Sequence, residues 1–88
     1  MRSRIDPPAI RRELRQQFRE TLGLRLRKLR RDAGFTHEQV AAWVGIMRYE
    51  MVRIEMGMDE PSVWLLRDLA AAYGLTIDDL IRGIGVPS

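Results

Sequence analysis

The chain has 88 residues, of which 31% are charged and 45% are hydrophobic, and its formal net charge is +3. A chain of this length predicts one compact domain with a modest core, which argues against a deep enzyme cleft. The absence of cysteine excludes disulfides and thiol chemistry, and the single histidine, His37, excludes a multi-histidine metal site. We therefore expect a non-enzymatic protein without a metal or other cofactor. Because no apolar run is long enough to span a membrane, we expect a cytoplasmic one.

The charge is distributed unevenly along the chain. Residues 1–31 carry eleven basic residues against three acidic ones, a balance of +8, whereas residues 32–88 carry four against nine, a balance of −5. Such a basic segment favours a polyanion or an acidic protein surface as the partner. Arginine makes up fourteen of the fifteen bases, and its planar guanidinium suits the paired hydrogen bonds that phosphate accepts.

Apolar residues recur at helical spacing over the first third of the chain. The recurring positions are Ile10, Leu14, Phe18, Leu22, Leu26, Leu29 and Ala33. This stripe predicts an amphipathic helix of about 25 residues, which Asp6 and Pro7 begin and Gly34 ends. Gly23 lies inside the stripe and is interpreted as a kink or joint. We divide the chain into an arginine-rich arm (1–20), a domain (21–83) and a short tail (84–88).

Four shorter helices are expected after the long one. Thr36 with Gln39, and Thr76 with Asp79, have the capping-box spacing and therefore mark two helix starts. Between them, glycine and proline positions predict helices that end at Gly45, cover about 47–55, and run over about 61–73. No stretch alternates in the manner of a strand. The sequence thus predicts a compact all-α domain of five helices with an N-terminally extended first helix.

The segment from Thr36 to Gly57 carries the most specific pattern, THEQVAAWVGIMRYEMVRIEMG. Its spacing is that of a helix-turn-helix, in which two helices cross closely and the chain turns sharply between them. Ala41 is small at the crossing point, and Gly45 can adopt the positive φ of the turn. The apolar residues expected to pack both helices onto the domain are Val40, Val44, Ile46, Met51 and Ile54.

This pattern resembles the lambda-repressor/Cro-like (Xre) helix-turn-helix family. The resemblance covers about residues 21–83 and includes LGLRLRKLRRDAGFT (22–36) and YGLTIDDLI (73–81). It implies sequence-specific binding to double-stranded DNA, usually as a two-fold dimer, in the control of transcription. We expect a repressor-like regulator associated with the nucleoid. The dimer seam is left open between the long first helix and the apolar C-terminal end.

The resemblance also implies which residues meet DNA. The third helix would lie in the major groove with its N-terminal residues toward the base edges. Its outward positions, together with the start of the second helix, give the expected DNA-binding residues Thr36, His37, Met47, Arg48, Tyr49, Val52 and Arg53. His37 stands where the family commonly has glutamine, and the alternative for it is a solvated surface side chain. Arg30 and Glu55 match a pair that is structural in similar domains.

Several features depart from an ordinary DNA binder. The third helix has no net charge, because Arg48 and Arg53 are balanced by Glu50 and Glu55. The turn after it, 57–60, is acidic. If the chain binds DNA, the arm must supply phosphate contacts, for which the candidates are Arg11, Arg12, Arg15 and Arg19.

The alternative function is a protein-interaction module on the same fold. It would bind another regulator through the arm and through apolar residues at positions that are usually polar. The candidate partner surface consists of Ile10, Leu14, Phe18, Leu24, Trp43, Trp64 and Leu65. There are two further interpretations of the arm residues Ile10, Leu14 and Phe18. They could cover the other exposed apolar residues, or form the seam of a homodimer.

Overall fold

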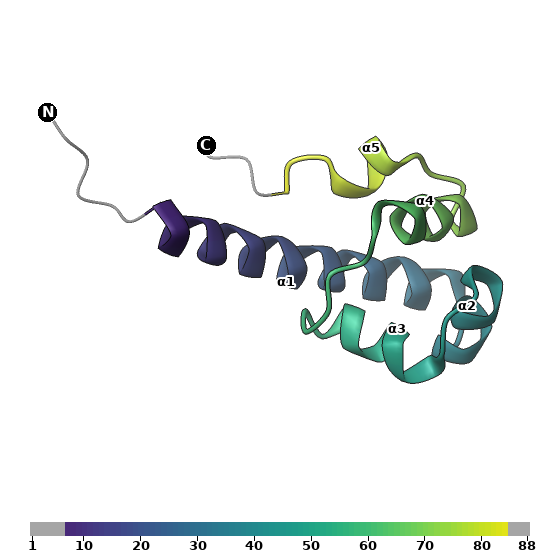
Figure 1. Cartoon of the computed structure of the whole chain (residues 1–88). Coiled ribbons are helices and arrows are strands. Elements are labelled where there is room, and N and C mark those ends of the chain that lie inside the picture. Colours follow the sequence, from purple (N-terminus) through teal and green to yellow (C-terminus); the bar gives the residue numbers. More distant parts are fainter. Residues whose placement is uncertain (1–6, 85–88) are drawn as a thin grey trace, which may run out of the picture.

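Five helices and no strands make up the described part of the chain, residues 7–84, in the computed structural model (Figure 1). In chain order they are α1 (Pro7–Ala33), α2 (His37–Val44), α3 (Arg48–Glu55), α4 (Val63–Ala72) and α5 (Ile77–Ile81). The predicted all-α class and the extended first helix are confirmed. The predicted capping residue Asp6 and the last residues of the predicted tail lie outside the described range.

The helix boundaries follow from local chemistry. Thr36 and Thr76 each accept a hydrogen bond from a backbone N–H three residues on, at 3.1 Å, while the side chains of Gln39 and Asp79 accept from the cap N–H. Both predicted capping boxes are therefore present. Gly45 ends α2 with a φ of 75°, a conformation in which a Cβ would be strained.

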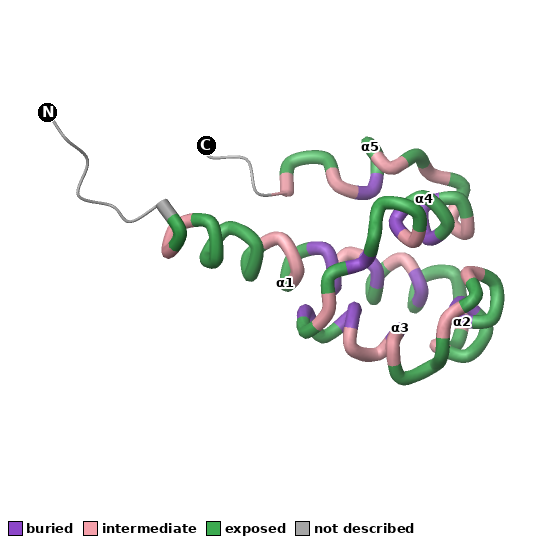
Figure 2. The backbone as a smooth tube through the Cα atoms, viewed as in Figure 1, coloured by how far each residue is buried: buried purple, intermediate pink, exposed green. Residues whose placement is uncertain are grey.

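The long helix α1 supports two groups of helices (Figure 1). α3 packs along one side of its second half, and α5 contacts it on the other side, with α2 and α4 closing the bundle at its C-terminal end. The first turns of α1 extend beyond the bundle and are largely exposed, whereas buried positions gather in its second half (Figure 2). The described molecule is elongated as a result, at 52 × 23 × 21 Å.

The core lies between the second half of α1 and the other four helices, each of which contributes at least one buried side chain. It consists of the fully or nearly fully buried side chains Leu22, Leu26, Val40, Ala41, Met51, Ile54, Leu66, Leu69, Ala70 and Leu80. Most of the predicted packing residues of the helix-turn-helix are in this set, and Val44 and Ile46 are half-buried against it. Among the C-terminal apolar residues, Leu80 is buried and Ile77, Ile81 and Ile84 pack against the core.

Gly23 is not a kink, because α1 runs without interruption from Pro7 to Ala33. A Cβ at position 23 would lie 2.5 Å from the backbone oxygen of Glu55 and 2.7 Å from that of Ile54. The glycine is therefore needed for close approach between α1 and the end of α3. The sequence pattern indicated a special position but suggested the wrong reason for it.

No helix within residues 7–84 combines the length and the apolar character that crossing a membrane requires.

Candidate nucleic-acid interface

The α2–turn–α3 unit has the geometry of a helix-turn-helix. Ile46 donates its backbone N–H to the carbonyl oxygen of Ala41 at 3.0 Å, which closes the turn around Gly45. Met47 caps α3 with extended backbone but has no side-chain hydrogen bond to the helix. The first N–H groups of α3 are consequently not capped by a side chain and are available to an anionic group.

The starts of α2 and α3 lie side by side on one face. The guanidinium Nε of Arg48 is 3.8 Å from a carboxylate oxygen of Glu38, which joins the two helix starts. Thr36 and His37 line the same shallow depression as these two side chains. At the start of α3, Met47, Arg48 and Tyr49 are each about 60% exposed. Three of the seven predicted DNA-binding residues, Thr36, His37 and Arg48, therefore line one depression, and Met47 and Tyr49 are exposed on either side of Arg48 in the sequence.

Further along α3, Arg53 is held by the turn that follows the helix. Its Nε and Nη2 donate to the two carboxylate oxygens of Asp59 at 2.9 and 3.0 Å. These hydrogen bonds, and the positive charge behind them, lower the pKa of Asp59 below its usual value. Val52 is half-buried beside it. Arg53 thus faces outward as expected, but two of its donor groups are engaged when no DNA is present.

Arg30 and Glu55 form the predicted pair between α1 and the end of α3. Arg30 donates from Nε and Nη2 to Glu55 at 2.8 and 3.0 Å, and both residues are more than nine-tenths buried. The hydrogen bond to Glu55 raises the pKa of Arg30. Arg30 also donates from Nη1 to the carbonyl oxygen of Phe35 at 3.0 Å, which fixes the entry into α2.

His37 is the third member of this network. Its Nε2 lies 2.9 Å from a carboxylate oxygen of Glu55, and its side chain is only 25% exposed. The interpretation of His37 as a solvated surface residue is therefore wrong. Because a carboxylate only accepts hydrogen bonds, Nε2 carries the proton. Nδ1 and the backbone N–H are then the His37 groups that remain for a ligand on this face.

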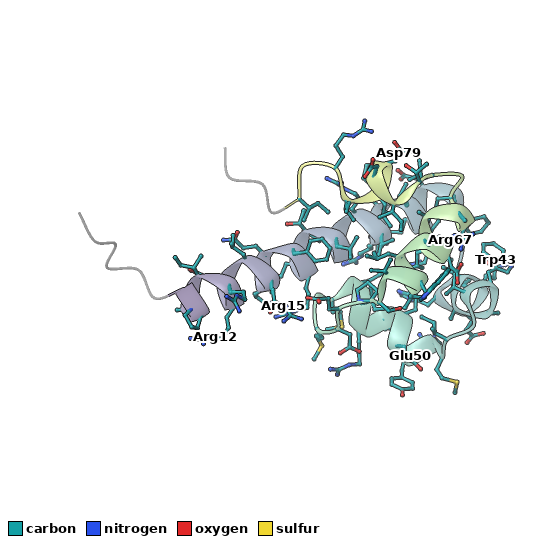
Figure 3. All side chains as sticks on the ribbon, turned by 45° about the horizontal axis from the view of Figure 1, so that its top comes forward. Arg12, Arg15, Trp43, Glu50, Arg67 and Asp79 are labelled. Atoms are coloured by element: carbon teal, nitrogen blue, oxygen red, sulfur yellow. The ribbon has the colours of Figure 1, made fainter. Side chains whose placement is uncertain are left out.

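The arm arginines divide between two sides of α1. Arg12, Arg15 and Arg19 follow each other at helical spacing and share one face. Arg15 and Arg19 lie 2.9 and 3.5 Å from carboxylate oxygens of Glu60, so this face is turned toward the end of α3. Figure 3 shows Arg12 and Arg15 on the same side of the molecule as Glu50 of α3. Glu60 in the acidic turn after α3 is therefore neutralised by the arm, chiefly through the Arg15 hydrogen bond that lowers the pKa of Glu60.

Two arginines outside the predicted set also lie beside α3. Arg27 and Arg31 of α1 line a small depression of about 120 Å³ together with His37, Val52 and Met56. Both are exposed. Arg27 lies three residues before Arg30 and four before Arg31, and this helical spacing was the signal that could have indicated their shared position.

The predicted partner surface is split between the two ends of the molecule. Ile10 is half-buried and Leu14 is 41% exposed on the arm, whereas Trp43 and Trp64 are 54% and 70% exposed on α2 and α4. Figure 3 shows Trp43 at the end of the molecule opposite Arg12 and Arg15. The arm therefore does not cover the tryptophans of its own chain.

Two members of that surface are less available than expected. Phe18 of α1 and Leu65 of α4 are half-buried and pack against the core. Leu24 stays 64% exposed on the outer side of α1. Among the described residues, no group of three or more histidine or carboxylate side chains lies together as a metal site.

Helix packing, turn geometry and an exposed α3 define a helix-turn-helix unit. Residues 21–82 match the family described as "Helix-turn-helix domain". The chain therefore belongs to the helix-turn-helix domain family, and the Xre-like resemblance seen in its sequence is confirmed.

Its relatives and a solved structure agree with that placement. The chain is 35% identical over 60 residues to the HTH-type transcriptional regulator DdrOP3 of Deinococcus deserti, covering 68% of this chain and 46% of that protein. It is 33% identical over 61 residues to the SPbeta prophage-derived uncharacterized HTH-type transcriptional regulator YonR of Bacillus subtilis, covering 69% and 56%. The chain thus spans about half the length of these two relatives.

The crystal structure of the clp gene regulator ClgR from Corynebacterium glutamicum superposes with a TM-score of 0.69 at 32% sequence identity. The similarity covers 72% of this chain and 67% of that one.

Proposed function

We propose that this chain is a transcriptional regulator that reads the sequence of double-stranded DNA with α3 as a homodimer. The observation that carries the proposal is the shared face of the two helix starts, joined by Arg48 and Glu38 at 3.8 Å. A helix start presents free N–H groups and a partial positive charge to phosphate, and the neighbouring exposed side chains of α3 would reach base edges. The names of the relatives and the family match support the regulatory role.

The exposed residues of α3 have chemically distinct roles in this proposal. Arg48 would donate to guanine O6 and N7, the commonest specific contact in the major groove. Met47, Tyr49 and Val52 would contact thymine methyl groups. Arg53 would bind a base or a phosphate after exchanging Asp59 for it. Nothing in this arrangement resembles a catalytic site, so we assign no enzymatic activity.

Phosphate contacts would come from two groups of arginines that flank α3. Arg12, Arg15 and Arg19 on the arm lie beyond its C-terminal end, and Arg27 and Arg31 lie alongside it. Several of the basic side chains near α3 already have an acidic partner. We therefore expect the affinity for DNA to depend only weakly on salt concentration for a protein with so many arginines. The dependence should become steeper when the acidic partners of these arginines are removed.

A homodimer would place two α3 helices in successive major grooves. Two half-sites would then be separated by about one helical turn of DNA, roughly 34–36 Å. Occupying such a site at a promoter would repress transcription and would place the protein at the nucleoid. The selected DNA sequences should accordingly be palindromic.

The test is a binding titration on duplexes selected from random DNA. Arg48→Ala should weaken binding to the selected duplex by about tenfold or more and relax the preference at one base position. Arg82→Ala is the matched control, because it removes one exposed arginine that directly follows α5. Arg27→Ala and Arg31→Ala should weaken binding equally on selected and scrambled DNA and reduce the salt slope by about one each. If Arg48→Ala behaves like Arg82→Ala, α3 does not read DNA.

The second candidate function is the binding of another regulatory protein, which the exposure of Trp43 and Trp64 favours. It predicts that Trp43→Ala and Trp64→Ala leave DNA binding unchanged and abolish capture of that partner. The arm would have to act as a separate contact in this case, because it lies at the opposite end of the molecule.

A further inference from the structure

An open apolar depression lies between α2 and α4. Its volume is about 530 Å³, and it is lined by Phe35, Trp43, Val44, Asp68, Ala71 and Ala72. The rings of Phe35 and Trp43 meet edge to face with centroids 4.6 Å apart, so the aromatic wall has a defined shape. We call this depression the tryptophan groove. No residue of α3 lines it, and an occupant would leave α3 accessible.

The tryptophan groove contains one acidic residue. Asp68 lies among its lining residues and forms no ion pair with any other described residue. An apolar floor beside an unpaired carboxylate suits a helix that carries aliphatic side chains next to a base.

The arm of this chain has that chemistry. Ile10 and Leu14 are one helical turn apart on the side of α1 that does not face α3, and Arg11 lies between them in the sequence. Leu14 is 41% exposed, and Arg11 is exposed and pairs with no described acid. This segment therefore has an aliphatic pair and an adjacent positive charge without a partner.

The arm is prevented from entering the groove of its own chain. α1 is continuous from Pro7 to Ala33, and Phe35 at the groove follows directly after it. Between Ile10 and Ala33 an α-helix rises roughly 35 Å, and it keeps the two sites apart. Any contact between arm and groove is consequently a contact between two molecules.

We infer that the arm of a second copy of this chain docks in the tryptophan groove, with Ile10 and Leu14 against Trp43 and Arg11 beside Asp68. Because arm and groove lie at opposite ends of one elongated molecule, two antiparallel copies fill both grooves at once. The pair is thus a closed two-fold dimer, in which each contact is made twice. The inference rests on the proposed function in one respect: it gives the interface of the homodimer that the proposed function assumes.

The experiment measures the mass of the full chain without DNA, by light scattering at increasing protein concentration. The wild-type chain should be a dimer, and Leu14→Asp and Trp43→Ala should each be monomeric. Leu24→Asp is the matched control, since Leu24 is equally apolar and exposed on α1 outside the arm; it should remain a dimer. Circular dichroism on each variant establishes that the fold is kept.

Mixing the two defective variants distinguishes this seam from others. The Trp43→Ala chain has an intact arm and the Leu14→Asp chain an intact groove, so an equimolar mixture should recover one of the two contacts and form dimers at higher concentration. Combining Arg11→Asp with Asp68→Arg in one chain should likewise restore the dimer that each single change weakens. A seam between two arms predicts no effect of Trp43→Ala and no recovery on mixing.

Three results would overturn the inference: a monomeric wild-type chain, a dimer unaffected by Trp43→Ala, or a mass that grows beyond two copies. A monomeric wild-type chain would also remove the homodimer from the proposed function. None of the three results bears on whether α3 reads DNA, because binding to a single half-site is measured separately on the same variants. Loss of DNA binding with an intact dimer would overturn the proposed function alone.

Discussion

Arg30 of α1 donates two hydrogen bonds, of 2.8 and 3.0 Å, to the carboxylate of Glu55 at the end of α3, and both residues are more than nine-tenths buried. This pair fixes the angle at which α3 leaves the bundle. The same carboxylate holds His37 at the start of α2, so a single buried charge orients both helices of the helix-turn-helix.

Replacing Arg30 by Met should lower the free energy of unfolding by about 3 kcal/mol, since it leaves the Glu55 carboxylate buried without its main partner. Urea denaturation measures the loss. Lys28→Met breaks an exposed ion pair, Lys28 with Asp32 at 2.9 Å, and should leave stability nearly unchanged. Equal effects of the two substitutions would show that the buried pair has no special role.

Gly23→Ala should destabilise the protein by about 2 to 3 kcal/mol, even though alanine favours helix over glycine by about 1 kcal/mol. The added Cβ would lie 2.5 Å from the backbone oxygen of Glu55, and backbone yields less readily than a side chain. Thr21→Ala, at an exposed position on the same helix, is the control and should be neutral in thermal unfolding. A more stable Gly23→Ala variant would refute the close approach.

Asp59→Asn should tighten DNA binding roughly fivefold, because it removes a negative charge near the expected phosphates and releases Arg53. The salt dependence should become steeper at the same time. Asp32→Asn removes an equal charge from α1 and should have little effect. Weaker binding of the selected duplex by the Asp59→Asn variant would mean that Asp59 aligns Arg53 for DNA instead of competing with DNA.

Acid should destabilise the fold through the cap of α5. The backbone and side-chain hydrogen bonds of Thr76 lower the pKa of Asp79 below its usual value. Its contribution is therefore complete above about pH 4, the unfolded value, and is lost as the pH falls through the folded one. Asp79→Asn should flatten this acid limb in unfolding measured from pH 7 to 2. An acid limb that is unchanged in the Asp79→Asn variant would show that this cap does not carry the acid dependence.

Alkali should act through Tyr73, whose hydroxyl is buried without a hydrogen-bond partner among the described residues. Burial raises the pKa of Tyr73 to about 12, so stability that is complete below about pH 10 is lost as the pH rises through the folded value. Tyr73→Phe should remove that loss and add about 1 kcal/mol near pH 7, since no unpaired hydroxyl remains. The exposed Tyr49→Phe variant should match the wild type.

The sequence alone determined the helices and their family. Capping boxes at Thr36 and Thr76, a glycine at the turn and a helical apolar stripe depend on residues close together in the chain, and such local rules can be applied to a sequence. The Arg30–Glu55 pair was also accessible, but only through the resemblance, because its members are 25 residues apart.

Only the tertiary structure decided which charges are available and which surfaces adjoin. Arg15, Arg19 and Arg53 look alike in the sequence, yet each meets an acid in the folded chain. Packing of α1 against the end of α3 brings Arg15 and Arg19 to Glu60, and the turn after α3 brings Asp59 back to Arg53. His37 is likewise engaged by Glu55 from another helix. Contacts of this kind depend on distances across the fold, and sequence spacing does not carry them. The continuous helix α1, which keeps the arm away from Trp43, could be predicted from the sequence. The tryptophan groove could not, because its lining residues come from separate parts of the chain.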